Sequence, residues 1–78
     1  MIISLYPLHY EKYSPRQQRE KVIEEIRELE DAADLKDIAE EAFDVMQALT
    51  GYLITLGVDL PRANRRHIRK LRRREHDR

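Results

Sequence analysis

The fold is decided by residues 21–45, which read KVIEEIRELEDAADLKDIAEEAFDV. Apolar residues recur at helical spacing on both sides of a short interruption at residues 33–35. This pattern predicts two helices joined by a tight turn, and such a hairpin places its helices antiparallel. Each helix carries one acidic motif, Glu-Glu-x-x-Glu at residues 24–28 and Glu-Glu-x-x-Asp at residues 40–44. The stretch therefore predicts an all-α fold with an acidic motif on each arm of a hairpin.

Capping residues predict where these two helices begin. Ser14 and Gln17 match a capping box, and Pro15 suits the first helical turn, so a first helix is expected over about residues 15–33. Asp34 is placed to cap the second helix, because an aspartate side chain can accept an N–H of the first turn.

The second helix is expected to end at Gly57, since glycine readily adopts the left-handed conformation that follows many helices. Asp59-Leu60-Pro61 opens a third, basic helix, because proline is tolerated in a first turn. For the segment before the helices, a strand, a helical turn and an arm on a partner subunit all stay open. The expected organisation, in chain order, is an N-terminal arm (1–13), one helical domain (14–74) and a frayed tail (75–78).

The chain has 78 residues and no cysteine, which excludes disulfides and thiolate zinc sites. A domain this small buries only about 60% of its unfolded surface, and oligomerisation is a usual remedy. The predicted second helix has a broader apolar face than two neighbouring helices can cover. We therefore expect a homodimer whose helices pack as a four-helix-type bundle.

The net charge of zero conceals two opposed halves. Residues 1–44 hold six basic and twelve acidic side chains, whereas residues 45–78 hold nine basic and three acidic ones. The balance argues against a protein that simply coats nucleic acid. No basic leader precedes an apolar core at the start, and the uncharged run at residues 45–58 is shorter than the ~20 residues of a membrane span. A cytoplasmic location is expected.

Two pairs of carboxylates are the strongest candidates for a functional site. With ~100° of rotation per residue, Glu25 and Glu28 border the first apolar stripe, and Glu41 and Asp44 border the second. Counted outward from Asp34, the two pairs lie at matching heights in the hairpin. Four carboxylates so gathered need compensating charge, and Mg²⁺ prefers such oxygen ligands. Glu24 and Glu40 are expected on the backs of their helices, as solvated or supporting charges.

Two plainer interpretations compete with a magnesium site. Acidic residues on helices are mostly solvated, and these could pair with Lys21, Arg27 or Lys36. A di-iron bundle would require Glu-x-x-His motifs, and neither motif contains a histidine.

The third helix carries a basic stripe of His67, Lys70 and Arg74 at i, i+3 and i+7. Held beside the acidic hairpin, this stripe could bind phosphate groups. An arginine-rich helix end is also commonly just solvated, and it complements the helix dipole. The aromatic residues that could stack on a base are Tyr10, Tyr13, Phe43 and Tyr52, although Tyr52 falls in an apolar stripe.

Residues 21–29 and 37–45 resemble the Glu-x-x-Glu…Glu-x-x-Asp signature of MazG-like all-α nucleotide pyrophosphohydrolases. Residues 56–60 and the His-x-x-Lys-Leu-x-x-Arg pattern at 67–74 are similar to that family's third-helix opening and tail, so the likeness covers roughly residues 18–74. It implies Mg²⁺-dependent hydrolysis of (deoxy)nucleoside triphosphates between the α and β phosphates, giving monophosphate and pyrophosphate. It also implies dimers or dimers of dimers.

The resemblance implies a role for each matched carboxylate. Glu25, Glu28, Glu41 and Asp44 would be the metal ligands. For the chemistry itself, a carboxylate such as Glu25 or Glu28 could accept the proton of the attacking water.

Two positions depart from the family's pattern of small residues before the last acid of each motif. Arg27 could neutralise part of the acidic cluster, and Phe43 could alter the approach of the helices. A catalytically silent interaction module of the same fold therefore stays open. So does a small helical nucleic-acid-binding protein that uses its Arg-rich third helix.

Overall fold

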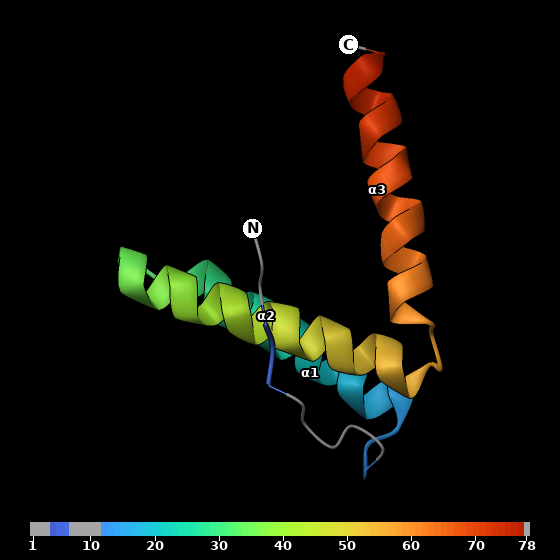
Figure 1. Cartoon of the computed structure of the whole chain (residues 1–78). Coiled ribbons are helices and arrows are strands. Elements are labelled where there is room, and N and C mark those ends of the chain that lie inside the picture. Colours follow the sequence, from blue (N-terminus) through green and yellow to red (C-terminus); the bar gives the residue numbers. More distant parts are fainter. Residues whose placement is uncertain (1–3, 7–11, 78) are drawn as a thin grey trace.

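The computed structural model describes residues 4–6 and 12–77 of the chain (Figure 1). Across these residues it is all-helical, as predicted, and has no strand. The three helices are α1 (Pro15–Asp31), α2 (Leu35–Thr55) and α3 (Leu60–His76). None of them is long and apolar enough to cross a membrane.

The predicted capping box begins α1. The Ser14 hydroxyl oxygen accepts the Gln17 N–H at 3.1 Å, and the Ser14 N–H donates to Gln17 Oε1 at 2.9 Å. The helix ends at Asp31, two residues before the predicted end, because Ala32 has extended backbone angles. The joint to the next helix is therefore slightly longer than the sequence pattern predicted.

Aspartates cap the other two helices. The carboxylate of Asp34 accepts the N–H of Asp37 at 2.8 Å, and the carboxylate of Asp59 accepts the N–H of Arg62 at 3.1 Å. Both starts were predicted. The helix α3 continues to His76, two residues beyond its predicted end near residue 74.

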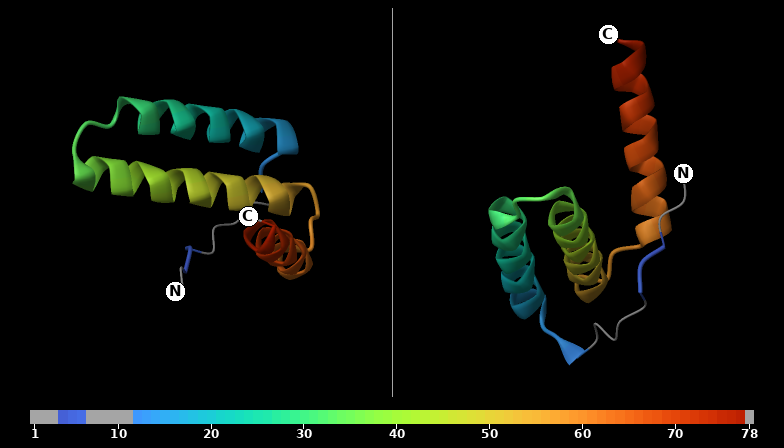
Figure 2. Two further views of the ribbon diagram at one scale, coloured as in Figure 1. Left: turned by 90° about the horizontal axis from the view of Figure 1, so that it is seen from above. Right: turned by 90° about the vertical axis from the view of Figure 1, so that its left-hand side faces the viewer.

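The packing of α1 against α2 forms an antiparallel hairpin (Figure 2). On α2 the buried residues are Ala48 and Gly51, whose small size lets the helices approach closely. On α1 the buried residues are Gln18, Val22 and Glu25. The Gln18 side-chain amide donates to the backbone oxygen of Ala48 at 3.2 Å, which ties the two helices together away from the turn.

The face that α1 turns to α2 differs from the predicted stripe. The spacing of Val22, Ile26 and Ala33 in the sequence predicts one apolar stripe. Val22 is buried as expected, but Ile26 and Ala33 are exposed. The helix is rotated so that Glu25 lies inside the seam instead of at its edge. Polar groups thus take part in the core of this small domain.

The third helix stands away from the hairpin (Figures 1 and 2). The radius of gyration is 14.5 Å, whereas a compact domain of this length is expected at about 11.5 Å. Ile68 and Leu71 of α3 remain exposed. The large apolar residues that are exposed on α2 are Leu35, Ile38, Phe43, Met46, Leu49, Leu53 and Ile54. A single chain therefore leaves much of its apolar surface uncovered.

Replacing Gly57 with alanine is expected to destabilise the fold by about 1 kcal/mol, the lower end of the penalty for a left-handed residue with a side chain. Gly57 has a φ of +73°, and a Cβ built there meets nothing within 4 Å, so the penalty is conformational and not steric. Gly57→Asn is the matched control, since asparagine tolerates this conformation better. Urea unfolding measures both; equal stability of all three proteins would contradict the assignment.

Candidate metal centre

Glu25 lies at the centre of the site, on the face of α1 that packs against α2. Only 5% of its surface is exposed. One oxygen, Oε1, forms an ion pair with the ammonium group of Lys21, whose nitrogen lies 2.8 Å away. The other, Oε2, is buried and has no hydrogen-bond partner among the residues that the structure describes. A buried carboxylate oxygen without a partner is costly, so this oxygen is available to a ligand.

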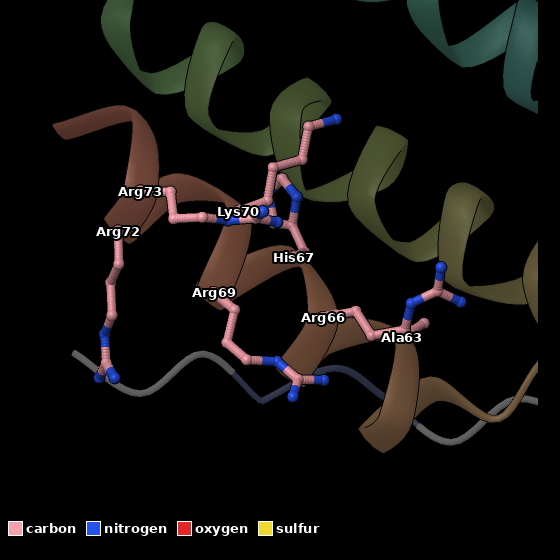
Figure 3. A pocket seen from close by; sticks show the side chains of 7 residues that line it. All are labelled: Ala63, Arg66, His67, Arg69, Lys70, Arg72 and Arg73. Carbon is pink, nitrogen blue, oxygen red and sulfur yellow. The ribbon is translucent and has the colours of Figure 1, made fainter. Parts of the chain in front are cut away.

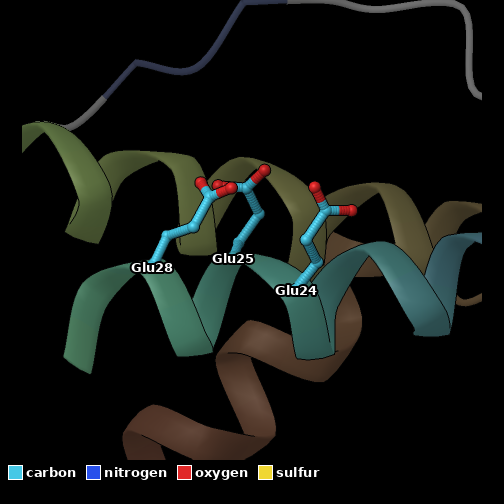
Figure 4. A group of neighbouring side chains, drawn as sticks. All are labelled: Glu24, Glu25 and Glu28. Carbon is cyan, nitrogen blue, oxygen red and sulfur yellow. The ribbon is translucent and has the colours of Figure 1, made fainter. Parts of the chain in front are cut away.

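Two groups of carboxylates share Glu25. In the first, oxygens of Glu25, Glu41 and Asp44 all lie within 4.8 Å of one another. In the second, the same holds for Glu24, Glu25 and Glu28, which point to one side of α1 (Figure 4). Each of the four residues predicted as metal ligands belongs to at least one group. The matching heights expected from the turn at Asp34 thus bring α1 and α2 carboxylates together.

Glu41 resembles Glu25 in having an unsatisfied oxygen. The residue is half-buried, and its Oε2 also lacks a hydrogen-bond partner within the described part of the chain. Glu28 and Asp44 are exposed at the rim. The four predicted ligands therefore comprise two carboxylates at the helix seam, Glu25 and Glu41, and two that are exposed to solvent, Glu28 and Asp44.

Glu24 is exposed, as expected of a solvated or supporting charge, but its position on α1 differs from the prediction. It was predicted on the back of α1, but its carboxylate joins the second group and lies 3.7 Å from the Lys21 ammonium. The rotation that buries Glu25 explains this, because it carries the preceding residue toward the same edge. Glu40 is exposed and belongs to neither group, as expected.

The charged groups of the site shift one another's pKa values. The charge of Glu25 is the main cause that raises the pKa of Glu28, and Glu41 and Glu24 add to it. The pKa of Lys21 is raised, chiefly by its hydrogen bond to Glu25. Among the described residues, Lys21 is the one cation within 4.0 Å of these carboxylates. One lysine leaves most of the negative charge uncompensated.

A cavity of about 520 Å³ opens beside Glu25 and Asp44 toward the start of α1. Tyr13, Gln17 and Gln47 also line it. Of the aromatic candidates for base stacking, Tyr13 is thus beside the carboxylates. The two glutamines were not predicted, although Gln47 follows Asp44 at a spacing of three residues and so shares its side of α2.

The remaining aromatic candidates lie elsewhere. Tyr52 is half-buried on α2, in agreement with its place in an apolar stripe, and Phe43 is exposed. Tyr10 lies outside the described residues.

The basic stripe of α3 does not reach the carboxylates within one chain. His67 and Lys70 line an open hollow of about 810 Å³ together with arginines of the same helix (Figure 3). Arg74 is exposed near the end of α3 and is not part of that lining. No described residue of α3 lines the cavity beside Glu25.

The two departures from the MazG-like pattern leave the carboxylate groups intact. Arg27 is exposed and makes no ion pair with a described residue. Phe43 is 48% exposed, so it does not separate α1 from α2. Among the described residues, Arg27 thus does not pair with the carboxylates of either group.

Comparison with known proteins gives one family. A family model described as phosphoribosyl-ATP pyrophosphohydrolase matches residues 7–74. This family is part of the MazG-like all-α superfamily, so the resemblance of the acidic motifs is confirmed. No curated protein matches the chain, and neither does any solved structure.

Glu28→Gln should weaken the pH dependence of stability. A raised pKa means that folded Glu28 holds its proton more tightly than the unfolded chain does. Stability is therefore expected to fall as the pH rises from the ordinary value of 4.5 through the pKa of folded Glu28. Glutamine carries no charge to repel Glu25, so the variant should be the more stable protein at neutral pH.

Urea unfolding over this pH range, with a chelator present, measures the effect. Glu30→Gln is the matched control, because Glu30 is exposed on α1 and lies outside both carboxylate groups. A Glu28→Gln protein that follows the parent at every pH would contradict the assignment.

Proposed function

Because the chain belongs to the phosphoribosyl-ATP pyrophosphohydrolase family, we propose that it is a metal-dependent hydrolase of nucleoside triphosphates. Cleavage between the α and β phosphates would give a monophosphate and pyrophosphate. One observation carries the proposal: Glu25, Glu41 and Asp44 offer oxygens within 4.8 Å of one another, and two of these residues have a buried oxygen without a partner.

The donor set fits a hard divalent cation. All donors are carboxylate oxygens, which Mg²⁺ and similar ions prefer, and no histidine lies in either group. Glu25, Glu41 and Asp44 would hold the ion, with Glu28 as a further ligand from the neighbouring group. When bound, Mg²⁺ would offset the carboxylate charge and polarise the phosphate oxygens of the substrate.

Glu28 is the better candidate for the general base. Glu25 is buried and already forms an ion pair with Lys21. Glu28 is exposed and lies beside the other carboxylates. A carboxylate with a raised pKa is a stronger base than an ordinary one, so Glu28 is suited to accept a proton from the attacking water.

The substrate phosphates would be bound by the basic stripe of His67, Lys70 and Arg74. Within one chain α3 stands apart from the carboxylates, so this role depends on assembly. The exposed apolar residues of α2 and α3 support a homodimer or a dimer of dimers, packed as a four-helix-type bundle. Such a bundle would let the basic helix of one copy reach the carboxylates of another.

Incubation with Mg²⁺ and a panel of nucleotides tests the activity. The panel includes the common NTPs and dNTPs as well as phosphoribosyl-ATP, which the family description names. We expect release of pyrophosphate from at least one of them. Glu41→Gln should lower the rate on the order of 100-fold, about 2.7 kcal/mol of transition-state stabilisation.

Glu40→Gln is the matched control, since Glu40 is the neighbouring residue but lies outside both groups. Its rate should stay close to that of the parent. If no nucleotide is hydrolysed, and a labelled oligonucleotide binds with a steep dependence on salt, the chain is a nucleic-acid-binding protein instead.

Sedimentation tests the assembly. Leu49 is 42% exposed in the middle of the apolar face of α2. Leu49→Lys should shift the parent's dimer toward monomer, because a charge in an apolar interface is costly to desolvate. Glu40→Lys introduces the same residue at an exposed polar position and should leave the dimer unchanged. A folded parent that sediments as a monomer at micromolar concentration would contradict the bundle.

A further inference from the structure

Lys21 forms an ion pair with Glu25, the central residue of the proposed metal centre. Its ammonium lies 2.8 Å from Glu25 Oε1, and its side chain is about half exposed while that of Glu25 is 7% exposed. Glu25 is shared by both carboxylate groups. The ion pair is therefore formed by a half-exposed cation and a buried carboxylate that lies close to the other proposed ligands.

The ammonium of Lys21 has a second carboxylate within ion-pair distance. Glu24 Oε1 lies 3.7 Å from the same nitrogen, and Glu24 is exposed. A lysine stem is long and flexible, and its ammonium has three donors that can be re-aimed. The ammonium of Lys21 can thus leave Glu25 and still pair with a carboxylate, because Glu24 lies close to it on the exposed side.

We propose that Lys21 is a tethered counter-ion that competes with the divalent cation for Glu25. In the empty centre its ammonium supplies part of the missing positive charge. Binding of the cation displaces the ammonium toward Glu24, because two cations on one buried carboxylate repel each other. This inference rests on the proposed function, since it assumes that Glu25 is a metal ligand.

Competition of this kind lowers the apparent metal affinity. The apparent dissociation constant equals the intrinsic one divided by the fraction of molecules in which Glu25 is free of Lys21. If the ion pair is formed in roughly nine of ten molecules, removal of the ammonium tightens binding by about 10-fold. The parent protein would bind Mg²⁺ less tightly than its carboxylates alone allow.

Calorimetric titration with Mg²⁺, without nucleotide, measures this effect. Lys21→Met keeps the stem but removes the ammonium, and should bind Mg²⁺ about 10-fold more tightly than the parent. Lys21→Arg keeps a cation beside Glu25 and should stay near the parent. Arg19→Met is the control for loss of one charge: Arg19 is exposed on α1 and makes no ion pair with a described residue. Its affinity should change by less than about 3-fold, since exposed charges are well screened.

The displacement itself can be observed by NMR. The chain has four lysines, Lys12, Lys21, Lys36 and Lys70, so the Lys21 Cε signal is assigned by its absence in Lys21→Arg. Addition of Mg²⁺ should shift the Lys21 signal and leave those of Lys12 and Lys36 in place. The shift should be absent in Glu41→Gln at the same Mg²⁺ concentration, since that variant lacks a ligand.

The outcomes separate this inference from the function on which it rests. If the parent binds Mg²⁺ and Lys21→Met binds it equally or less tightly, or the Lys21 signal does not move, the competition is wrong and the metal centre stands. If neither the parent nor Lys21→Met binds Mg²⁺, both proposals fail. Circular dichroism of each variant, recorded first, shows whether it is folded; Lys21→Gln replaces Lys21→Met if the latter is not.

Discussion

The burial of the Glu25 carboxylate between α1 and α2 is the constraint on which the rest of the structure depends. Desolvation of a charge is expensive unless it is paired, and here only one of the two oxygens has a partner, the ammonium of Lys21. The small residues Ala48 and Gly51 bring the helices close, and the Gln18 amide ties them together. A close and fixed seam is what holds carboxylates of two different helices within reach of a single ion.

The same seam explains why one chain looks incomplete. The inner faces of α1 and α2 are small and partly polar, so they use little of the apolar surface that the chain carries. The remainder is spread over all three helices, where Ile26, Leu49 and Leu71 are exposed. The carboxylates of the acidic half of the chain are likewise not in contact with the basic side chains of α3 among the described residues. An assembly of several copies would satisfy both the apolar and the electrostatic requirement.

Local features were predictable from the sequence, whereas features set by tertiary rotation were not. The caps at Ser14, Asp34 and Asp59 depend on neighbouring residues only, and they are where the pattern placed them. The convergence of the two acidic motifs followed from counting outward from the turn. The rotation of α1 that brings Glu24 into the cluster depends on how its residues fit those of α2, which no single-helix pattern contains. The direction of α3 is also a tertiary property, because its weak apolar stripe does not specify a neighbour.

A charged residue in a helix seam sets stability against function. In a protein selected only to fold, a glutamine or an apolar residue at position 25 would avoid the desolvation cost and the repulsion from Glu28 and Glu41. A glutamate there carries a desolvation cost that its ion pair with Lys21 offsets at one oxygen only. The buried carboxylate is therefore difficult to explain in a silent interaction module. The most stable version of this domain would be one that has lost its site.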